Sequence, residues 1–209
     1  MKLSPTLQGI YRDGDQRDAA NHLGMWAFIA TEILFFGGLF IAYVIYRGAY
    51  PIAFAIGSRH LEFWIGTTNT VVLLTSSLSM ALGDVMIKRG RRDALKVCLI
   101  ITFTLGLVFL GLKSFEYYQK FRAHEIPGAH FQMDGPPQTQ LFVLLYFAMT
   151  GLHAIHMLIG LGLLGWLMRS NRAGRLTPEQ HAPVEMVGLY WHFVDCIWVF
   201  LYPLLYLIR

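Results

Sequence analysis

The chain has 209 residues, of which 55% are hydrophobic and 14% are charged, and its mean hydropathy is +0.47. Soluble domains carry about a quarter charged residues, so this composition excludes an ordinary soluble domain. The net charge of +4 at pH 7 does not indicate nucleic-acid binding, because excess Lys and Arg in a membrane protein mark its cytoplasmic loops. Cys98 and Cys196 lie in apolar stretches without CxxC or Cys/His spacing, so we predict neither a disulfide framework nor a zinc site.

The first 22 residues are polar, so we expect no cleaved signal peptide and an uncleaved first helix that acts as the insertion signal. A helix needs about 20 apolar residues to cross the hydrocarbon core of a bilayer. Five segments qualify, at about residues 24–46, 63–87, 95–118, 141–168 and 184–208. The ten-residue alternation of membrane strands is absent. The sequence therefore predicts an all-α fold, an integral membrane bundle of five transmembrane helices forming a single domain over residues 1–209.

The predicted helix at 63–87 is unusually polar. Small and hydroxylated side chains let membrane helices approach closely and bond to one another. We therefore expect this helix to lie at the centre of the bundle, with about half of its hydroxyls bonding to carbonyls of their own helix. Its polar residues are Thr67, Thr68, Asn69, Thr70, Thr75, Ser76, Ser77 and Ser79.

Basic residues are unequally divided between the two sides of the predicted bundle. One side carries eleven, which are Lys2, Arg12, Arg17, Lys88, Arg89, Arg91, Arg92, Lys96, Arg169, Arg172 and Arg175. The other carries six, which are Arg47, Arg59, Lys113, Lys120, Arg122 and Arg209. Because Lys and Arg are enriched in cytoplasmic loops, we expect a cytoplasmic N-terminus and an external C-terminus.

Ionisable side chains inside the apolar segments are the most informative residues. A charge at mid-bilayer costs at least ~2.5–3.5 kcal/mol, so such groups face the bundle interior and have partners. At a rise of about 1.5 Å per residue, these groups fall at similar depths, which predicts one interior polar layer. We expect Glu32 to bond to a histidine of the 141–168 helix and His192 to pair with Asp195. The predicted network consists of Glu32, His153, His156, His192 and Asp195, supported by Glu116, Glu185 and Trp191.

Three interpretations of this network stay open from the residues alone. It could fix the register of the helices, form a metal or redox site from side chains of several helices, or carry protons or ions. The dense histidine boxes and Glu-x-x-His pairs of di-metal sites are missing, as are a catalytic nucleophile set and a nucleotide fingerprint. We therefore assign no catalytic, cofactor-binding or metal-ligating residue.

Five segments carry distinctive residues in a fixed order. They are LGMWAFIATEILFFGGLFIAY at 23–43, TNTVVLLTSS at 68–77, SFEYY at 114–118, TGLHAIHMLIG at 150–160 and WHFVDCIWVFLYPLLY at 191–206. Together they resemble the helices of the cytochrome c oxidase subunit III family, including its membrane-buried glutamate, here Glu32. The resemblance covers nearly all of residues 23–206 and implies the five-helix bacterial form, which lacks the first two of seven helices.

The resemblance implies a non-catalytic subunit without its own cofactor, in a proton-pumping haem–copper oxidase that reduces dioxygen with electrons from cytochrome c. It implies direct packing on subunit I, a complex with subunit II and other respiratory subunits, and support for proton uptake. Haem and copper are expected in the partner subunits, and no nucleic acid is expected as a partner. The expected location is the bacterial inner membrane. Arg169 and His181 fall near family positions at the lipid-headgroup level, which makes them candidate ligands of a bound phospholipid.

Alternative functions remain at this stage. The nearest are subunit III of a quinol oxidase and the related protein of nitric oxide reductase. The glutamate in TEILFF favours the cytochrome c branch, since quinol oxidases more often carry aspartate there. A stand-alone transporter would need an internal repeat or broken helices, and the sequence has neither. An independent metalloenzyme would need a bound metal.

Overall fold

The computed structural model describes residues 14–128, 131–133 and 135–207, and in this part of the chain the regular secondary structure is all helical, with no strand. The all-α prediction is confirmed. The α-helices are α2 (Gly14–Ala49), α3 (Pro51–Arg59), α4 (Phe63–Lys88), α5 (Arg92–Arg122), α6 (Thr139–Arg172) and α7 (Ala182–Tyr202). A 3-10 turn, η1 (Pro178–Gln180), precedes α7, and a π-helical turn, η2 (Pro203–Leu207), follows it.

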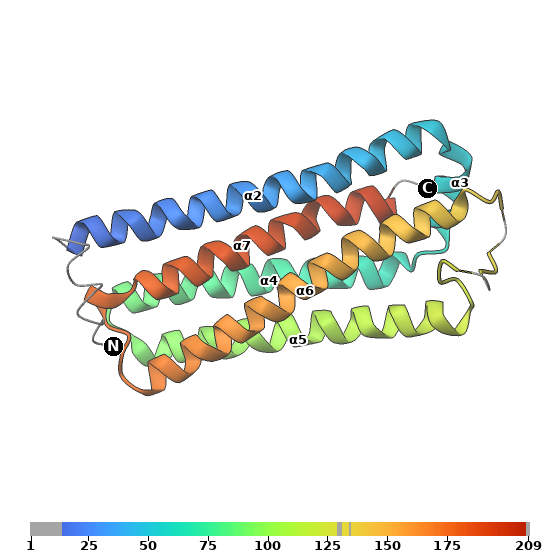
Figure 1. Ribbon diagram of the computed structural model, residues 1–209. Coiled ribbons are helices and arrows are strands. Elements are labelled where there is room, and N and C mark those ends of the chain that lie inside the picture. The colour runs from blue at the N-terminus through green and yellow to red at the C-terminus, as the bar shows by residue number, and fades with distance from the viewer. Residues whose placement is uncertain (1–13, 129–130, 134, 208–209) are drawn as a thin grey trace.

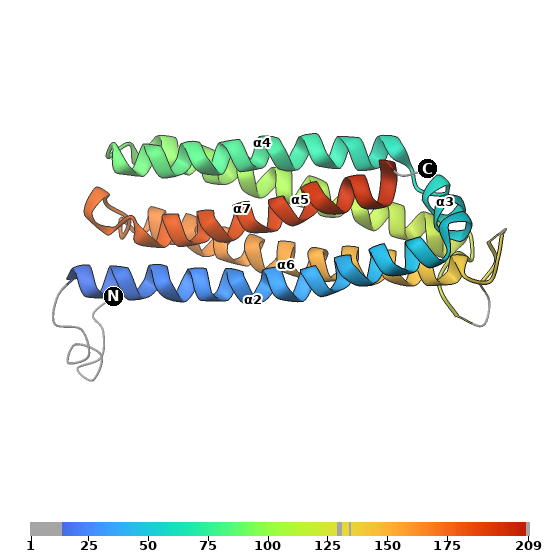
Figure 2. The ribbon, with the colours of Figure 1, turned by 90° about the horizontal axis from the view of Figure 1, so that it is seen from above.

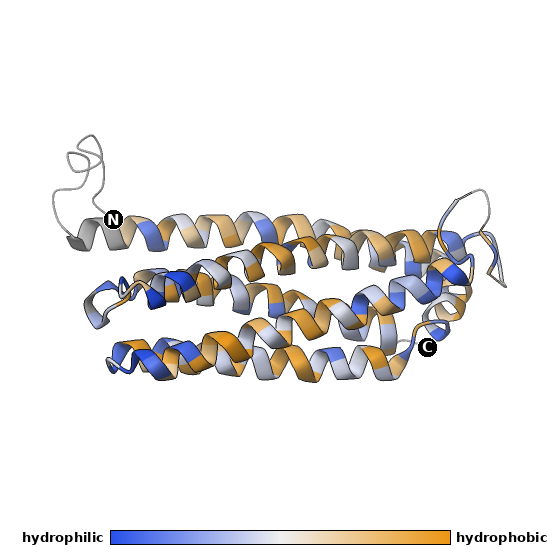
Figure 3. Cartoon of the chain, turned by 90° about the horizontal axis from the view of Figure 1, so that it is seen from below, coloured by the Kyte–Doolittle hydropathy of each residue, from blue (hydrophilic) through white to orange (hydrophobic). Residues whose placement is uncertain are grey.

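Five of the described helical segments are long and apolar enough to cross a membrane, which confirms the predicted bundle. They lie side by side with alternating direction, and hydrophobic residues dominate their middle while hydrophilic residues gather toward both ends (Figures 1 and 3). The helices extend a few residues past the predicted spans. An apolar window locates the hydrocarbon layer, whereas the hydrogen-bonded helix continues into the polar region.

The short helix α3 was not predicted, because nine residues are too few to span a bilayer. Its φ-restricted Pro51 stands at the first helical position, which favours a helix start. Phe54 packs against Tyr43 and Phe142, with ring centroids 5.3 and 5.5 Å apart. This aromatic contact fixes the end of α2 to the start of α6.

Helices α6 and α7 form the middle of the bundle, with α2 on one side and the α4–α5 pair on the other (Figure 2). In the most apolar window of α7, 61% of residues are buried, against 33% in α4 and 17% in α2. The prediction that α4 is central is therefore wrong. About half of its hydroxyls bond to carbonyls of α4 itself, as expected, namely those of Thr67, Thr70, Thr75 and Ser76. Those of Thr67, Thr70 and Ser76 also bond to side chains of α7.

The basic stretches at 88–96 and 169–175 lie at the same end of the bundle, which we call the basic end, where α2 also begins (Figure 1). Two of the six basic residues assigned to the opposite side are buried inside the bundle and are not loop charges. Lys113 and Lys120 are only 4% and 5% exposed, because they lie on the buried stripe of α5. Lys2, Arg12 and Arg209 lie outside the described residues, as does the side chain of Arg17.

Candidate functional site

Glu32 of α2 contacts His156 of α6, as predicted. Its Oε2 lies 3.1 Å from the Nε2 atom of His156, and the Nδ1 atom of His156 lies 2.9 Å from the carbonyl of Leu152. The two side chains are 19% and 11% exposed. Phe36 covers the imidazole edge-on, with ring centroids 5.3 Å apart. Glu32 and Phe36 are one helical turn apart, so α2 presents both to the same histidine.

His153, one turn along α6, has different surroundings. It is 1% exposed and lies between the rings of Phe109 and Trp198, whose centroids are 5.4 and 5.3 Å away. Neither of its ring nitrogens has a hydrogen-bond partner among the described residues. The HAIH spacing therefore places the two histidines on neighbouring faces, one against α2 and the other against α5 and α7.

His192 and Asp195 do not pair, so that prediction is wrong. The Nδ1 atom of His192 lies 2.7 Å from the hydroxyl of Ser77 on α4. Asp195 is 4% exposed, and neither carboxylate oxygen has a hydrogen-bond partner in the described structure. The i,i+3 spacing brings the side chains to one face of α7, but the hydroxyl-rich α4 offers His192 a partner across the interface.

Trp191 anchors the same α4–α7 interface. Its Nε1–H group donates to the hydroxyl of Ser76 at 3.1 Å. Its indole fills the space left by Gly106 of α5 and Gly160 of α6, where an added Cβ would lie 2.8 and 3.0 Å from indole atoms. These glycines therefore permit the close approach of three helices to one tryptophan.

Glu185 belongs to a separate cluster at the basic end. Its Oε1 atom lies 2.6 Å from Nζ of Lys88, which also reaches Asp84 at 2.8 Å. His181 and His22 lie 3.4 and 3.7 Å from the same carboxylate. A pocket of about 260 Å³ opens beside this cluster. Its lining residues are His22, Asp84, Glu185, Gly188, Leu189 and His192.

Glu116 lies in a buried cluster near the other end of the bundle, and its principal partner is Lys113, which the sequence analysis missed. Nζ of Lys113 is 2.8 Å from Oε2 of Glu116 and 2.7 Å from the hydroxyl of Tyr206. The hydroxyl of Tyr146 is 3.4 Å away, and the indole of Trp198 lies 4.8 Å from the ammonium group. The ammonium thus has a carboxylate, two phenols and an aromatic face around it.

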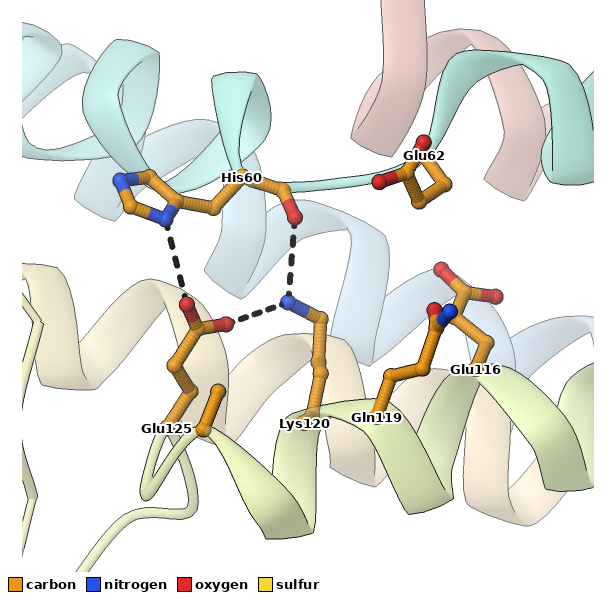
Figure 4. A pocket seen from close by; sticks show the side chains of 7 residues that line it. His60, Glu62, Glu116, Gln119, Lys120 and Glu125 are labelled. Carbon is orange, nitrogen blue, oxygen red and sulfur yellow. Dashed lines mark hydrogen bonds and ion pairs between the residues drawn. The ribbon is translucent and has the colours of Figure 1, made fainter.

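A pocket of about 310 Å³ borders this cluster (Figure 4). Lys120 binds Glu125 at 2.8 Å and the carbonyl of His60 at 3.3 Å, and the His60 ring also contacts Glu125, at 3.2 Å. Figure 4 shows Glu62 facing Glu116 across the pocket. The carboxyl group of Glu116 therefore lies between the buried Lys113 and a polar opening at this end of the bundle.

A signal for Lys113 was present in the sequence. Phe109, Lys113, Glu116 and Lys120 recur at helical spacing and form one buried stripe of α5. An i,i+3 pair of opposite charge inside an apolar helix indicates an internal ion pair. The predicted span 95–118 contains Lys113, but the count of basic residues assigned it to the outer side of the bundle.

The prediction of a single interior layer is also wrong, because the polar groups form separate clusters with different neighbours. No group of three or more His, Cys, Asp or Glu side chains in the described part of the chain is arranged to hold a metal ion. The clusters instead join pairs of helices, α2 to α6, α4 to α7, and α5 to α6 and η2. These contacts suit helix packing.

The two candidate lipid ligands lie in different surroundings. Arg169 lines a pocket of about 520 Å³ at the basic end, together with Trp166, Arg172 and Arg175. His181 precedes α7, where its ring contacts the carbonyl of Pro178 at 2.5 Å and also faces Glu185. Three arginines line one pocket, which makes it a better candidate for an anion than the predicted pair.

Comparison with known proteins agrees with this architecture. The family model for cytochrome c oxidase subunit III matches residues 6–208. The chain is 36% identical over 187 residues to cytochrome c oxidase subunit 3 of Thermostichus vulcanus, covering 89% of this chain and 86% of that protein. It is 32% identical over 212 residues to cytochrome c oxidase subunit 3 of Synechocystis sp., covering 99% and 85%.

A probable quinol oxidase subunit 3 of Staphylococcus haemolyticus is 26% identical over 189 residues, covering 90% of this chain and 89% of that protein. The first two relatives exceed 30% identity over most of both chains, and the family match leaves out only the first five residues and the last one. This chain therefore belongs to the cytochrome c oxidase subunit III family, the third subunits of haem–copper oxidases.

Proposed function

We propose that this chain is a non-catalytic subunit, without a cofactor of its own, in a proton-pumping terminal oxidase that reduces dioxygen to water. The observation that carries the proposal is that the buried ionisable side chains contact other parts of this chain. Glu32 lies in one cluster, and Lys113 and Glu116 lie in another. Each cluster contacts other helices of this chain, and the two do not converge on one ligand position. Such groups hold a bundle together, whereas a redox centre needs several ligands aimed at one point.

The subunit works within a complex of oxidase subunits. We propose that it packs directly on the subunit that holds haem and copper, stabilises it and supports its proton uptake, with subunit II and other respiratory subunits nearby. We also propose that the whole chain forms one domain, which the family match over residues 6–208 supports.

Cytochrome c is the electron donor that we propose for the complex. Relatives named cytochrome c oxidase subunit 3 reach 36% identity, and Glu32 stands in the TEILFF motif that favours this branch. A quinol oxidase is the second candidate, because the Staphylococcus haemolyticus relative is named as one at 26% identity.

We propose a bacterial inner membrane as the location, with the basic end in the cytoplasm. The grouping of the 88–96 and 169–175 stretches at one end of the bundle supports this orientation. The start of α2 lies at the same end, which supports a cytoplasmic N-terminus.

A phospholipid is a proposed ligand at the basic end. Arg169, Arg172 and Arg175 line one pocket of about 520 Å³, and Trp166 beside them is 50% exposed. Arginines suit an anionic headgroup, and tryptophan is common at the membrane interface. His181 lies on the neighbouring turn before α7 and is proposed to belong to the same headgroup layer.

The scaffold role is tested with Glu32→Ala, which removes the contact with His156. We expect reduced assembly or a shorter lifetime during turnover, with the haem spectra of the assembled complex unchanged. Leu34→Ala is the matched control, because Leu34 is 76% exposed on the same helix. Loss of a haem or copper signal from an otherwise assembled Glu32→Ala complex would contradict the non-catalytic role.

A further inference from the structure

Helix α2 is attached to the bundle at three depths, and the attachments differ in kind. Away from the basic end, the hydroxyl of Tyr43 donates to the carbonyl of Leu204 at 2.5 Å, beside the aromatic contacts with α3 and α6. At mid-depth, Glu32 contacts His156. Nearer the basic end, the contacts are the packing of Met25 and Ile29 against the core, a ring contact between Phe28 and Tyr190 at 6.1 Å and the 3.7 Å approach of His22 to Glu185.

The hydrogen bonds of His156 determine how many protons the mid-depth contact holds. A carbonyl oxygen only accepts, so the Nδ1 atom that faces the Leu152 carbonyl carries a hydrogen. A neutral imidazole then has a bare lone pair on Nε2, which cannot bond to an ionised carboxylate. The 3.1 Å contact with Glu32 therefore needs one more proton, on either Nε2 or the carboxyl group.

With that proton, the pair is either imidazolium and carboxylate or imidazole and carboxylic acid, and it is neutral overall in both forms. Without it, a full negative charge faces a lone pair at membrane depth, where neither group is well solvated. Loss of the proton breaks the Nε2–Oε2 bond, while the Nδ1–H bond to Leu152 stays.

We propose that Glu32 and His156 form a proton-dependent clasp that holds the part of α2 before Glu32 against α6 and α7. One bound proton closes the clasp, and its release lets this half of α2 move away while the half near Tyr43 stays attached. The clasp is a property of contacts within this chain, so it does not depend on which oxidase contains the subunit.

Other titratable groups near the clasp come from two of the three helices packed on α2. His153 lies one turn away on α6, and Tyr190 of α7 donates its hydroxyl to the carbonyl of His156 at 3.0 Å. Helix α3 lies at the far end of α2 and brings none to this depth. On α2 itself, the nearest described titratable groups are His22 and Tyr43.

Opening of the clasp would enlarge the pocket of about 260 Å³ at the basic end. Its wall includes His22 of α2, and its other lining residues belong to α4 and α7. Among these is His192, which bonds to Ser77 in the bundle interior. The protonation of a pair at mid-depth thus controls access to this pocket near the membrane surface.

Spin labels on both halves of α2 test the clasp in the assembled oxidase, reconstituted in lipid nanodiscs. One label pair is Gly24→Cys with Gly162→Cys, on α2 and α6 near the basic end, where an added Cβ meets nothing within 4 Å. The control pair is Gly48→Cys with Leu144→Cys, at the opposite end, where Leu144 is 53% exposed. Cys98 and Cys196 are replaced by Ala in both.

Pulsed electron paramagnetic resonance then gives the distance distributions over a pH series. We expect the first pair to shift reversibly to longer distances as pH rises, and the control pair to stay fixed. Glu32→Gln keeps the clasp closed at every pH, since its amide donates to a neutral Nε2. His156→Leu opens it at every pH.

A distance that does not change with pH in the chain with Glu32 overturns the proposal. The same shift in Glu32→Gln also overturns it, and would assign the response to His22 and Glu185 instead. If the His156→Leu variant does not assemble, the pH dependence of the label distance in the chain with Glu32 and in the Glu32→Gln variant still tests the clasp.

Discussion

The hydroxyl group of Tyr206 lies 2.7 Å from Oε1 and 2.9 Å from Oε2 of Glu116, and so joins the π-helical turn after α7 to the last turns of α5. Glu116 is 1% exposed and Tyr206 is fully buried. Lys113 completes the arrangement by donating to both residues. A buried charge with this many partners fixes the register of the two helices, because no other register supplies them.

Lys113→Met is predicted to destabilise the subunit strongly. The change leaves the Glu116 carboxylate without its counter-charge, and breaking a buried pair in this way costs about 3–5 kcal/mol. The measurement is the temperature at which the subunit dissociates or unfolds from the detergent-solubilised complex.

Lys96→Met is the control for that change, because Lys96 is exposed on the same helix. The double variant Lys113→Met, Glu116→Leu is expected to recover part of the loss, since it removes both charges. Equal stability of the Lys113→Met and Lys96→Met variants would show that the ion pair does not stabilise the fold.

Gly106→Ala is predicted to weaken the contact of α5 with α7. The new Cβ would lie 2.8 Å from the indole of Trp191 and 3.0 Å from Leu161, so the helices must separate. Overpacking of this kind costs about 1–3 kcal/mol. Thermal unfolding of the subunit in the complex measures the effect.

Gly111→Ala on the same helix is the matched control, because an added Cβ there meets nothing within 4 Å. This variant should be neutral or slightly stabilising, since Ala favours a helix more than Gly does. A Gly106→Ala subunit as stable as Gly111→Ala would mean that Trp191 can move aside without loss.

Replacing Arg169, Arg172 and Arg175 by Gln is predicted to reduce the amount of anionic phospholipid that co-purifies with the complex. Each basic group near an anionic headgroup contributes about 1 kcal/mol, so three losses should deplete the lipid severely. Native mass spectrometry and lipid extraction measure the retained lipid. Arg122→Gln, at the opposite end and bonded to Tyr118, is the control. Unchanged lipid content in the triple variant would show that this pocket does not bind a lipid headgroup.

Hydropathy predicted the transmembrane helices well because each helix that crosses a bilayer needs about 20 apolar residues, whatever its neighbours are. The predicted span 63–87 and the helix Phe63–Lys88 differ by one residue. Hydropathy says nothing about which helices are neighbours. The hydroxylated residues of α4 led us to expect this helix at the centre, whereas the buried Trp191 and Trp198 place α7 there.

The candidate site was only partly predictable for the same reason. Glu32 was expected to meet a histidine of the 141–168 helix because both groups are ionisable at membrane depth, and a lone charge there has a high cost. Only the structure selects His156 over His153. The partner of His192 was missed, since serine hydroxyls occur throughout α4 and only tertiary packing selects Ser77. The absence of a partner for Asp195 within the described structure depends on side-chain geometry that residue spacing does not encode.

The central claim is that the chain is a subunit without its own redox centre in a haem–copper oxidase. The most direct measurement is purification of the tagged chain from native membranes in mild detergent, followed by protein identification, haem spectroscopy and metal analysis of the complex and of the separated chain. We predict co-purification with a large haem- and copper-bearing subunit, and no stoichiometric haem or metal in the separated chain. Purification of the chain alone, or with a stoichiometric metal or haem of its own, would contradict the claim.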